Sequence, residues 1–149
     1  MKDKIQKTKL KVIVLAQNSW QGQWVNRQQL LSRLGTRHTI VYSTGGWFTW
    51  DRNSPEWCSA SLFGEFKLLD NVWVDESPQY LLLCPKLPLF DQTVMRLLCR
   101  RWKSWLDKQG EDGPLIAHVF HPMFYSYLKH LKPDFILYHA YDLYRHTPG

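Results

Sequence analysis

The chain lacks the sequence features of several large classes of protein. Its three cysteines, Cys58, Cys84 and Cys99, include no C-x-x-C pair, which argues against a disulfide framework or a zinc site and for a reducing compartment. The apolar run Val12–Ala16 is too short for the core of a signal peptide. No run approaches the roughly 18–20 apolar residues of a membrane span. We therefore expect a cytoplasmic protein without a bound metal.

Dense basic blocks are also lacking, although the chain is basic overall. Its 149 residues carry a formal net charge of +6, and the pI is about 9.3. This balance favours anionic partners such as nucleotides, phosphates or acidic lipids. The one pair of adjacent arginines, Arg100 and Arg101, lies inside a helical pattern and not in a basic tail. We therefore expect no nucleic acid among the partners.

Apolar runs and periodic segments alternate along the chain, which predicts strands alternating with helices. The strands are expected at Leu10–Ala16, Thr39–Tyr42, Leu115–Phe120 and Phe135–Tyr138, and the helices at Trp24–Leu34, Phe90–Gln109 and Pro122–Leu131. Two further short strands, Val72–Val74 and Tyr80–Cys84, are expected to pair as a small β-hairpin insert. With 44% hydrophobic residues the chain can form one domain over residues 1–149. The predicted fold is α/β, a doubly wound and mostly parallel sheet with helices on both faces.

The two long predicted helices have distinct apolar faces. Leu30, Leu31 and Leu34 define the buried face of the first, with Arg27 and Gln28 placed elsewhere. The second has a stripe that includes Trp102 and Trp105. Its basic residues leave two interpretations open: an ordinary helix that covers the sheet, or a peripheral contact with the inner face of an anionic membrane. The basic residues concerned are Arg96, Arg100, Arg101 and Lys103.

Polar residues follow the first and third predicted strands of the parallel set. In open α/β sheets, ligands bind at the carboxyl ends of the strands. The loop that contains Trp20, Gln21 and Gly22 is therefore a candidate to bind a phosphate or a sugar hydroxyl, or else an ordinary turn. His121 is a candidate general base, or else the cap of the helix that begins at Pro122. His118 lies within a strand, where a packed core histidine is the favoured interpretation.

A second polar group follows the last predicted strand. Asp142 is a candidate base for an attacking hydroxyl, or else a helix N-cap. His139 and Tyr141 flank it and are candidates to contact sugar hydroxyls or a sugar ring. Three tryptophans of the irregular middle segment either line an acceptor groove or form a satellite hydrophobic cluster. They are Trp47, Trp50 and Trp57.

Two of these segments together resemble bacterial glycosyltransferases of the GT-B fold, specifically the family 4-like and xanthan-type glucuronosyltransferase relatives. The first is a strand that ends in His121-Pro122, followed by a short helix. The second is the run from Tyr138 to Leu143, in which Tyr138 and Asp142 match the family pattern. His139 stands where an aspartate is common, and Leu143 also departs. Trp24–Leu34, which includes Arg27, resembles the family's first helix after a glycine-containing loop.

The resemblance implies the Rossmann-like N-terminal half of such an enzyme. That half holds the acceptor, a glycan or a lipid-linked glycan, while the nucleotide-sugar donor binds a C-terminal domain expected beyond Gly149. Asp142 or His121 is the implied base. No cofactor is expected in this half, and alone it should be inactive. The implied substrate-binding residues are Trp20, Gln21, Gly22, Arg27, His139 and Tyr141. The alternative is a free-standing flavodoxin-like module that binds a small anion or a protein partner.

Overall fold

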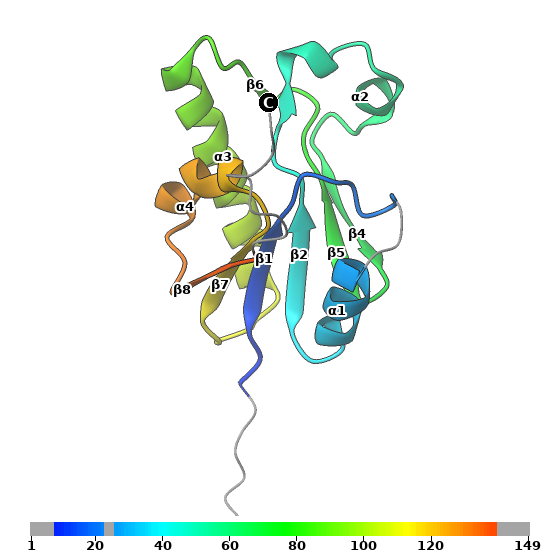
Figure 1. Cartoon of the computed structure of the whole chain (residues 1–149), viewed down its shortest axis with the longest axis vertical. Coiled ribbons are helices and arrows are strands. Elements are labelled where there is room, and N and C mark those ends of the chain that lie inside the picture. Colours follow the sequence, from blue (N-terminus) through cyan, green and yellow to red (C-terminus); the bar gives the residue numbers. More distant parts are fainter. Residues whose placement is uncertain (1–7, 23–25, 140–149) are drawn as a thin grey trace, which may run out of the picture.

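A computed structural model describes residues 8–22 and 26–139, which form a six-stranded sheet with helices against both faces (Figure 1). The strand order is β4-β5-β2-β1-β7-β8. All pairings are parallel except β4 with β5. The strands are β1 (Lys11–Leu15), β2 (Thr39–Ser43), β4 (Glu65–Leu69), β5 (Val72–Glu76), β7 (Leu115–Val119) and β8 (Phe135–Tyr138). The mostly parallel α/β sheet expected from the sequence is therefore confirmed.

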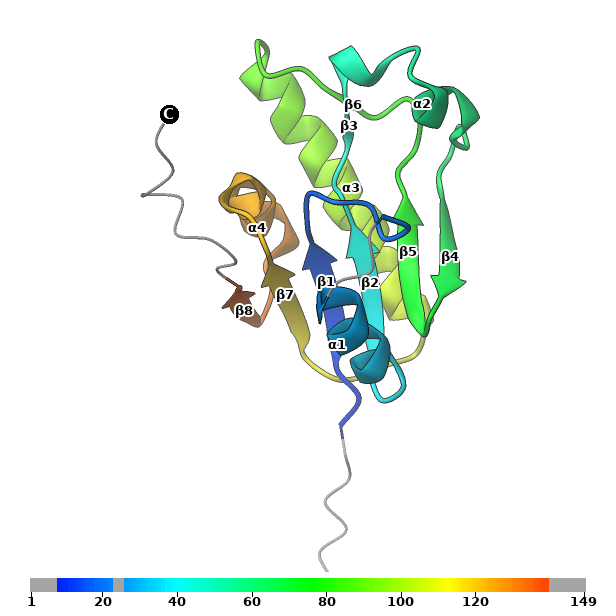
Figure 2. The same cartoon turned by 45° about the vertical axis from the view of Figure 1, so that its right-hand side comes forward.

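Helix α1 covers one face of the sheet, and α3 and α4 cover the other (Figure 2). A second, two-stranded sheet of β3 and β6 lies above the carboxyl ends of the parallel strands, together with α2 (Figure 1). The remaining elements are β3 (Trp47–Phe48), β6 (Leu82–Leu83), α1 (Asn26–Gly35), α2 (Pro55–Ser59), α3 (Pro88–Lys108), α4 (Tyr125–Leu131) and the 3-10 turns η1 (Thr49–Asp51) and η2 (Pro122–Phe124).

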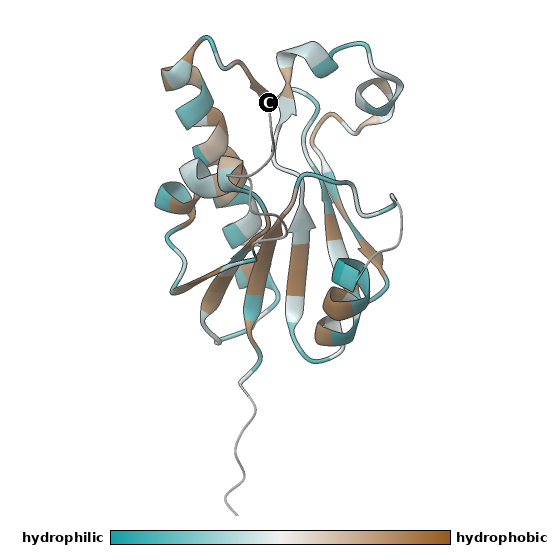
Figure 3. Cartoon of the chain, in the orientation of Figure 1, coloured by the Kyte–Doolittle hydropathy of each residue, from teal (hydrophilic) through white to brown (hydrophobic). Residues whose placement is uncertain are grey.

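The sheet separates two hydrophobic cores because successive residues of each strand point to opposite faces. Ile13 and Leu15 of β1 pack with Leu98 and Trp102 of α3, while Val14 packs with residues of α1 and β2. The central strands β1, β2 and β7 are mostly apolar on both faces and are brown over their middle residues in Figure 3. Such strands lack the polar alternation of a half-exposed sheet, as expected when helices cover both sides.

The predicted hairpin is the main error of the sequence-based fold. Val72–Val74 does pair antiparallel, but with β4, and its other side joins β2 inside the main sheet. Residues Leu82–Leu83 of the other expected strand pair instead with Trp47–Phe48, in parallel. The tight turn at Asp70 and Asn71, both with positive φ, lies before β5. The antiparallel hairpin of the structure is therefore formed by β4 and β5, and it belongs to the main sheet.

The expected buried face of α1 is only partly correct. Leu31 is fully buried, but Leu30 and Leu34 are 42% and 37% exposed. Arg27 and Gln28 are buried in their place. The buried face of α1 is therefore rotated about the helix axis from the predicted face, and it presents the charged side chain of Arg27 to the sheet.

A buried carboxylate joins the sheet to α3. The side chain of Asp75, at the end of β5, has no exposed surface and forms an ion pair with Arg101. Its Oδ2 also accepts hydrogen bonds from Trp102 Nε1 at 2.7 Å and from Ser43 Oγ at 2.9 Å. Arg101, one of the four cations considered for a membrane contact, therefore points inward, with its guanidinium 4.2 Å from the centre of the Phe66 ring.

Removing this carboxylate should destabilise the fold strongly. We expect Asp75→Ala to lower the free energy of unfolding by about 3–5 kcal/mol, because Arg101 would keep a partly buried charge without its partner. Asp107→Ala is the matched control, since Asp107 is 68% exposed and pairs with Lys11 at 3.5 Å. That change should cost less than about 1 kcal/mol. Urea denaturation of both variants checks the difference, and equal losses would contradict it.

Candidate functional site

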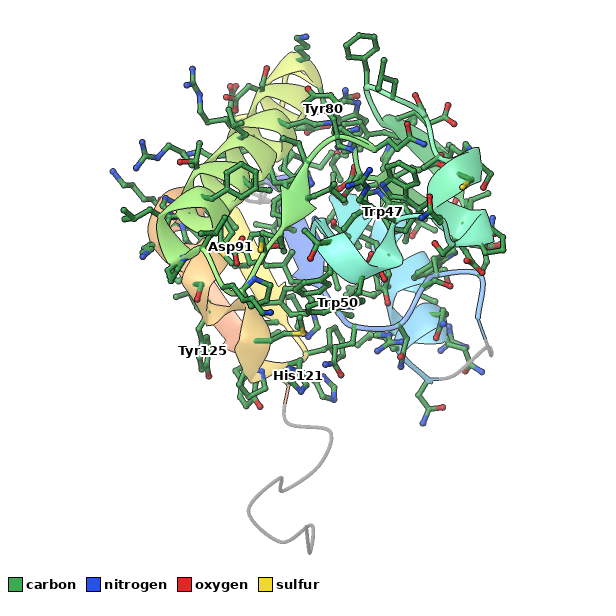
Figure 4. All side chains as sticks on the ribbon, turned by 90° about the horizontal axis from the view of Figure 1, so that it is seen from above. Trp47, Trp50, Tyr80, Asp91, His121 and Tyr125 are labelled. Atoms are coloured by element: carbon green, nitrogen blue, oxygen red, sulfur yellow. The ribbon has the colours of Figure 1, made fainter. Side chains whose placement is uncertain are left out.

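The loops that follow the parallel strands meet at one edge of the sheet, viewed from above in Figure 4. The loop after β1 runs through Trp20 and Gln21, and the loop after β2 contains Gly45 and Gly46. His121 follows β7, and His139 follows β8. The sequence placed these polar segments at a common edge, and for the described residues the parallel register brings them there.

The first loop is anchored by Trp20 and leaves Gln21 exposed. The Trp20 ring is buried against Tyr42, at 5.1 Å between ring centres, and its Nε1 donates to Asp70 at 3.3 Å. A short turn follows, in which Gly22 N donates to Ser19 O at 3.3 Å. A buried anchor therefore presents a polar side chain at the rim of the sheet.

The loop after β2 is held closely against α4. Gly45 has φ of +81°, and a Cβ there would lie 2.7 Å from the hydroxyl oxygen of Tyr127. That oxygen accepts a hydrogen bond from Gly46 N at 3.1 Å, and burial raises the pKa of Tyr127 to about 12. Ser77 Oγ donates to Gly45 O at 2.7 Å. A glycine is thus required at position 45 by both its conformation and its neighbours.

A cavity of about 610 Å³ opens over the ends of β1, β2 and β5. Trp20 and Gln21, both predicted site residues, contribute to its wall, as do Trp47 and Phe48 of β3. The remaining side chains of the wall are mostly hydroxyl, amide or carboxyl groups. They include Gln17, Ser19, Thr44, Asp51, Ser54, Glu56, Ser59, Asp75, Glu76 and Ser77.

The charge of this cavity is opposite to that of the whole chain. Besides Asp75, which is paired with Arg101, the wall carries Asp51, Glu56 and Glu76 against a single lysine, Lys67. Lys67 contacts Glu65 at 2.9 Å and Glu76 at 3.1 Å, and these hydrogen bonds raise its pKa. A cavity with more carboxylates than cations disfavours an anionic ligand, although the net charge of +6 pointed to one.

Phe48 of the cavity wall forms a stacked pair with Trp50, which is not itself part of the wall. Trp50 is 66% exposed and lies parallel to Phe48, with ring centres 4.4 Å apart and planes 4° apart. Asp51 fixes the turn, since its Oδ2 accepts from Phe48 N at 2.7 Å. In Figure 4, Trp50 appears between Trp47 and His121. Trp57 does not line the cavity, and its Nε1 donates to Gln79 O at 2.9 Å.

His121 caps the helical segment after β7, one of the two roles predicted for it. Its Nδ1 accepts a hydrogen bond from Met123 N at 3.1 Å. In a neutral ring with this cap, the proton lies on Nε2. Met123 also meets the first loop, because Gln17 Nε2 approaches its sulfur at 3.2 Å. His121 therefore stands beside the end of β1 but outside the wall of the cavity.

Three aromatic rings, those of His118, Phe120 and His139, form a mutually stacked cluster at β7 and β8. The ring centre of Phe120 lies 4.4 Å from that of His118 and 4.9 Å from that of His139. His118 is 4% exposed, and burial, assisted by the charge of His139, lowers its pKa to about 4. His118 is therefore a neutral core residue at pH 7, as predicted.

The other predicted site residues are placed only in part. Arg27 is buried beneath the edge, with its guanidinium over the rings of Tyr42 and Phe120. Asp142 and Tyr141 lie outside the described residues, so their predicted roles stay predictions.

A basic groove lies away from this edge, between α3 and α4. Its volume is about 520 Å³, and Arg100, Lys103, Lys108 and His130 are among the residues that line it. Burial and nearby cations lower the pKa of His130, whose Nε2 lies 2.8 Å from Gln92 Oε1. Three of the four cations proposed for a membrane-facing surface thus remain available on α3, while Arg101 is directed inward.

The described residues contain no group of three or more histidine, cysteine or acidic side chains arranged to bind a metal. The three cysteines are free thiols, and only Cys99 is buried, where burial raises its pKa to about 12. Within ranges 8–22 and 26–139, no helix has both the length and the apolar character needed to cross a membrane.

Sequence reasoning missed much of the cavity wall. Glu76 ends β5 and Ser77 follows it, but assigning that strand to a hairpin insert removed both residues from the shared edge. Asp51, Ser54 and Glu56 belong to short elements without a hydrophobic period. A usable signal was present in Asp75-Glu76-Ser77, a polar run immediately after a β-branched strand.

Comparisons with known proteins found no match to the chain among family models, curated proteins or solved structures. The resemblance to glycosyltransferases therefore rests on the sequence motifs alone.

The lowered pKa of His118 predicts a pH dependence of stability. In the unfolded chain His118 takes up a proton below about pH 6.5, whereas the folded protein takes it up only near pH 4. Lowering the pH from 6.5 to 4 should therefore remove about 2–3 kcal/mol of stability through this group. Urea denaturation across this range should show a shallower pH dependence for His118→Gln than for the wild type. Parallel curves would contradict the assignment.

Proposed function

We propose that this chain is the acceptor-side domain of a glycosyltransferase, with the cavity at the carboxyl edge of the sheet as its glycan-binding site. In this proposal the sheet is the Rossmann-like, doubly wound N-terminal half of a GT-B enzyme. The strand order supports it, because β1 joins β2 on one side and β7 on the other, with the connecting helices on opposite faces.

The composition of the cavity wall carries the proposal. Sugar rings have apolar faces that suit aromatic side chains and hydroxyl groups that suit amides, hydroxyls and carboxylates. Trp47 and Phe48 supply the first kind of surface, while Gln21, Ser54 and Glu56 supply the second. The exposed face of Trp50, held by its stack on Phe48, extends the aromatic surface outward.

In the full-length enzyme, a nucleotide-sugar donor on a second domain would face this edge. Asp142 is the proposed general base that takes the proton from the acceptor hydroxyl. His121, with the proton on Nε2 while Nδ1 caps Met123 N, is better suited to donate a hydrogen bond to the acceptor. The isolated domain should bind an acceptor without turnover, because the donor site lies in the other half.

A lipid-linked acceptor would bring this domain to a membrane surface. The exposed Arg100 and the half-buried Lys103 of the groove between α3 and α4 are cations that suit anionic head groups. Vesicle binding that is unchanged in the double variant R100E/K103E would remove this contact from the proposal.

Binding of oligosaccharides by the 149-residue protein tests the cavity. On an array of neutral, amino and acidic glycans, we expect binding to neutral or amino members and weaker binding to acidic ones, because the wall is rich in carboxylates. Trp50→Ala should weaken binding by about 1 kcal/mol, roughly five-fold, without unfolding the protein, since the ring is exposed. Isothermal titration with the best glycan measures this loss.

Phe63→Ala is the matched control, because Phe63 is 73% exposed and its ring contacts Tyr80, which is not in the cavity wall, whereas Trp50 stacks on Phe48 of the wall. Equal effects of the two substitutions, or no glycan bound at all, would count against the proposal. Binding of a small anion without any glycan would favour the flavodoxin-like binding module instead.

A further inference from the structure

Two buried nitrogen atoms share one place in the fold. Among residues 8–22 and 26–139, the buried side-chain nitrogen and oxygen atoms without a hydrogen-bond partner are Arg27 Nε and His118 Nε2. Both side chains lie against Phe120. Its ring centre is 5.3 Å from the guanidinium carbon of Arg27 and 4.4 Å from the ring centre of His118. Buried polar atoms ordinarily have hydrogen-bond partners, so two unpaired nitrogen atoms beside one ring indicate a binding site for a ligand that would pair with them.

The positive charge of Arg27 is not balanced within the described part of the chain. Arg27 is only 9% exposed and forms no ion pair there. Its guanidinium lies over two aromatic rings, at 5.3 Å from Phe120 and 5.8 Å from Tyr42. Such contacts offset only part of the free energy needed to remove an ion from water. An anionic group bound to Arg27 would neutralise this positive charge, which no described residue does.

The position of Arg27 in the sheet also suits a ligand. Tyr42 and His118 are the neighbours of Val14 in β2 and β7, so the guanidinium lies over the carboxyl half of β1. Phe120 N donates to Leu15 O at 2.9 Å just beyond. At β1 the strand order reverses, and open α/β sheets bind ligands at this point. Arg27 also belongs to the first turn of the ten-residue helix α1, where the helix dipole favours negative charge.

We propose that Arg27 and His118, which both lie against the Phe120 ring, bind a phosphate group on the α1 face of the sheet. A planar guanidinium offers paired donors that match phosphate oxygens. The imidazole of His118 adds one further hydrogen-bonding atom. The acidic cavity described above would repel the same ligand, so the two sites differ in chemistry. The phosphate site would exist whether or not the cavity binds a glycan.

Thermal unfolding of the 149-residue protein in inorganic phosphate tests the site, with sodium chloride at matched ionic strength as the reference. We expect the Tm of the wild type to rise by about 5–10 °C when phosphate exceeds its Kd roughly 100-fold. Arg33→Gln is the matched control, because Arg33 is an exposed arginine of the same helix. It should respond like the wild type, while Arg27→Gln should lose most of the shift.

A second measurement separates ligand binding from a structural role. In chloride without phosphate, we expect Arg27→Gln to be at least as stable as the wild type, because the substitution removes a buried, unbalanced charge. An equal phosphate shift in Arg27→Gln, no shift in the wild type, or a marked loss of stability of Arg27→Gln in chloride would each overturn the proposal.

A second ligand distinguishes a site for a phosphosugar from a site for free phosphate. Glucose 1-phosphate is compared with inorganic phosphate at equal concentration. A larger Arg27-dependent shift with glucose 1-phosphate would identify a phosphosugar site, and equal shifts would identify a site for the free anion. Both outcomes support a phosphate site at Arg27.

Discussion

The carboxylate of Asp75 is the contact on which the carboxyl edge of the sheet depends. It lies at the end of β5, accepts hydrogen bonds from β2 and from α3, and balances the charge of Arg101. Its other neighbour is Ser77, whose Oγ lies 3.3 Å from Oδ2 and also holds the backbone of Gly45. One buried anion therefore fixes two loops of the cavity wall and the helix behind them. Because an unpaired charge is so costly in this position, these elements are expected to keep their relative positions.

Periodicity predicted those parts of the fold whose stability comes from ordinary burial. The strands β1, β2, β7 and β8 were placed within one residue of their observed ends, because apolar residues on both faces leave few alternatives. The helix α3 was equally clear. The middle of the chain was not, since the β3–β6 pairing joins segments far apart in sequence and each strand has two residues. No local pattern specifies such a contact.

The candidate site divides in the same way. Trp20 and Gln21 follow a strand that the sequence identified, and they line the cavity as predicted. Arg27 was chosen as a site residue for its resemblance to a family motif, yet its burial means that the buried face of α1 is rotated from the expected one. Arg101 was named among the cations of a possible membrane contact and is instead the partner of Asp75. The position of each arginine side chain is determined by a residue distant in sequence: the Phe120 ring for Arg27 and the Asp75 carboxylate for Arg101.

The separation of charge within the molecule resolves an apparent conflict. A net charge of +6 suggests an anionic partner, while the cavity at the carboxyl edge of the sheet carries several carboxylates. The cations lie elsewhere, at Arg27 under α1 and in the groove between α3 and α4. Net charge therefore describes what the protein attracts from a distance, and the local lining determines what each site accepts.

The pairing of Trp47–Phe48 with Leu82–Leu83 has a kinetic consequence. It closes a long stretch of chain with a two-residue contact, so the entropic cost of forming it is high. The contact is anchored by Leu83, which is 3% exposed and packs in the same core as Leu98 and Trp102 of α3. The ribbon is therefore expected to form late in folding, after the main sheet and α3 have come together.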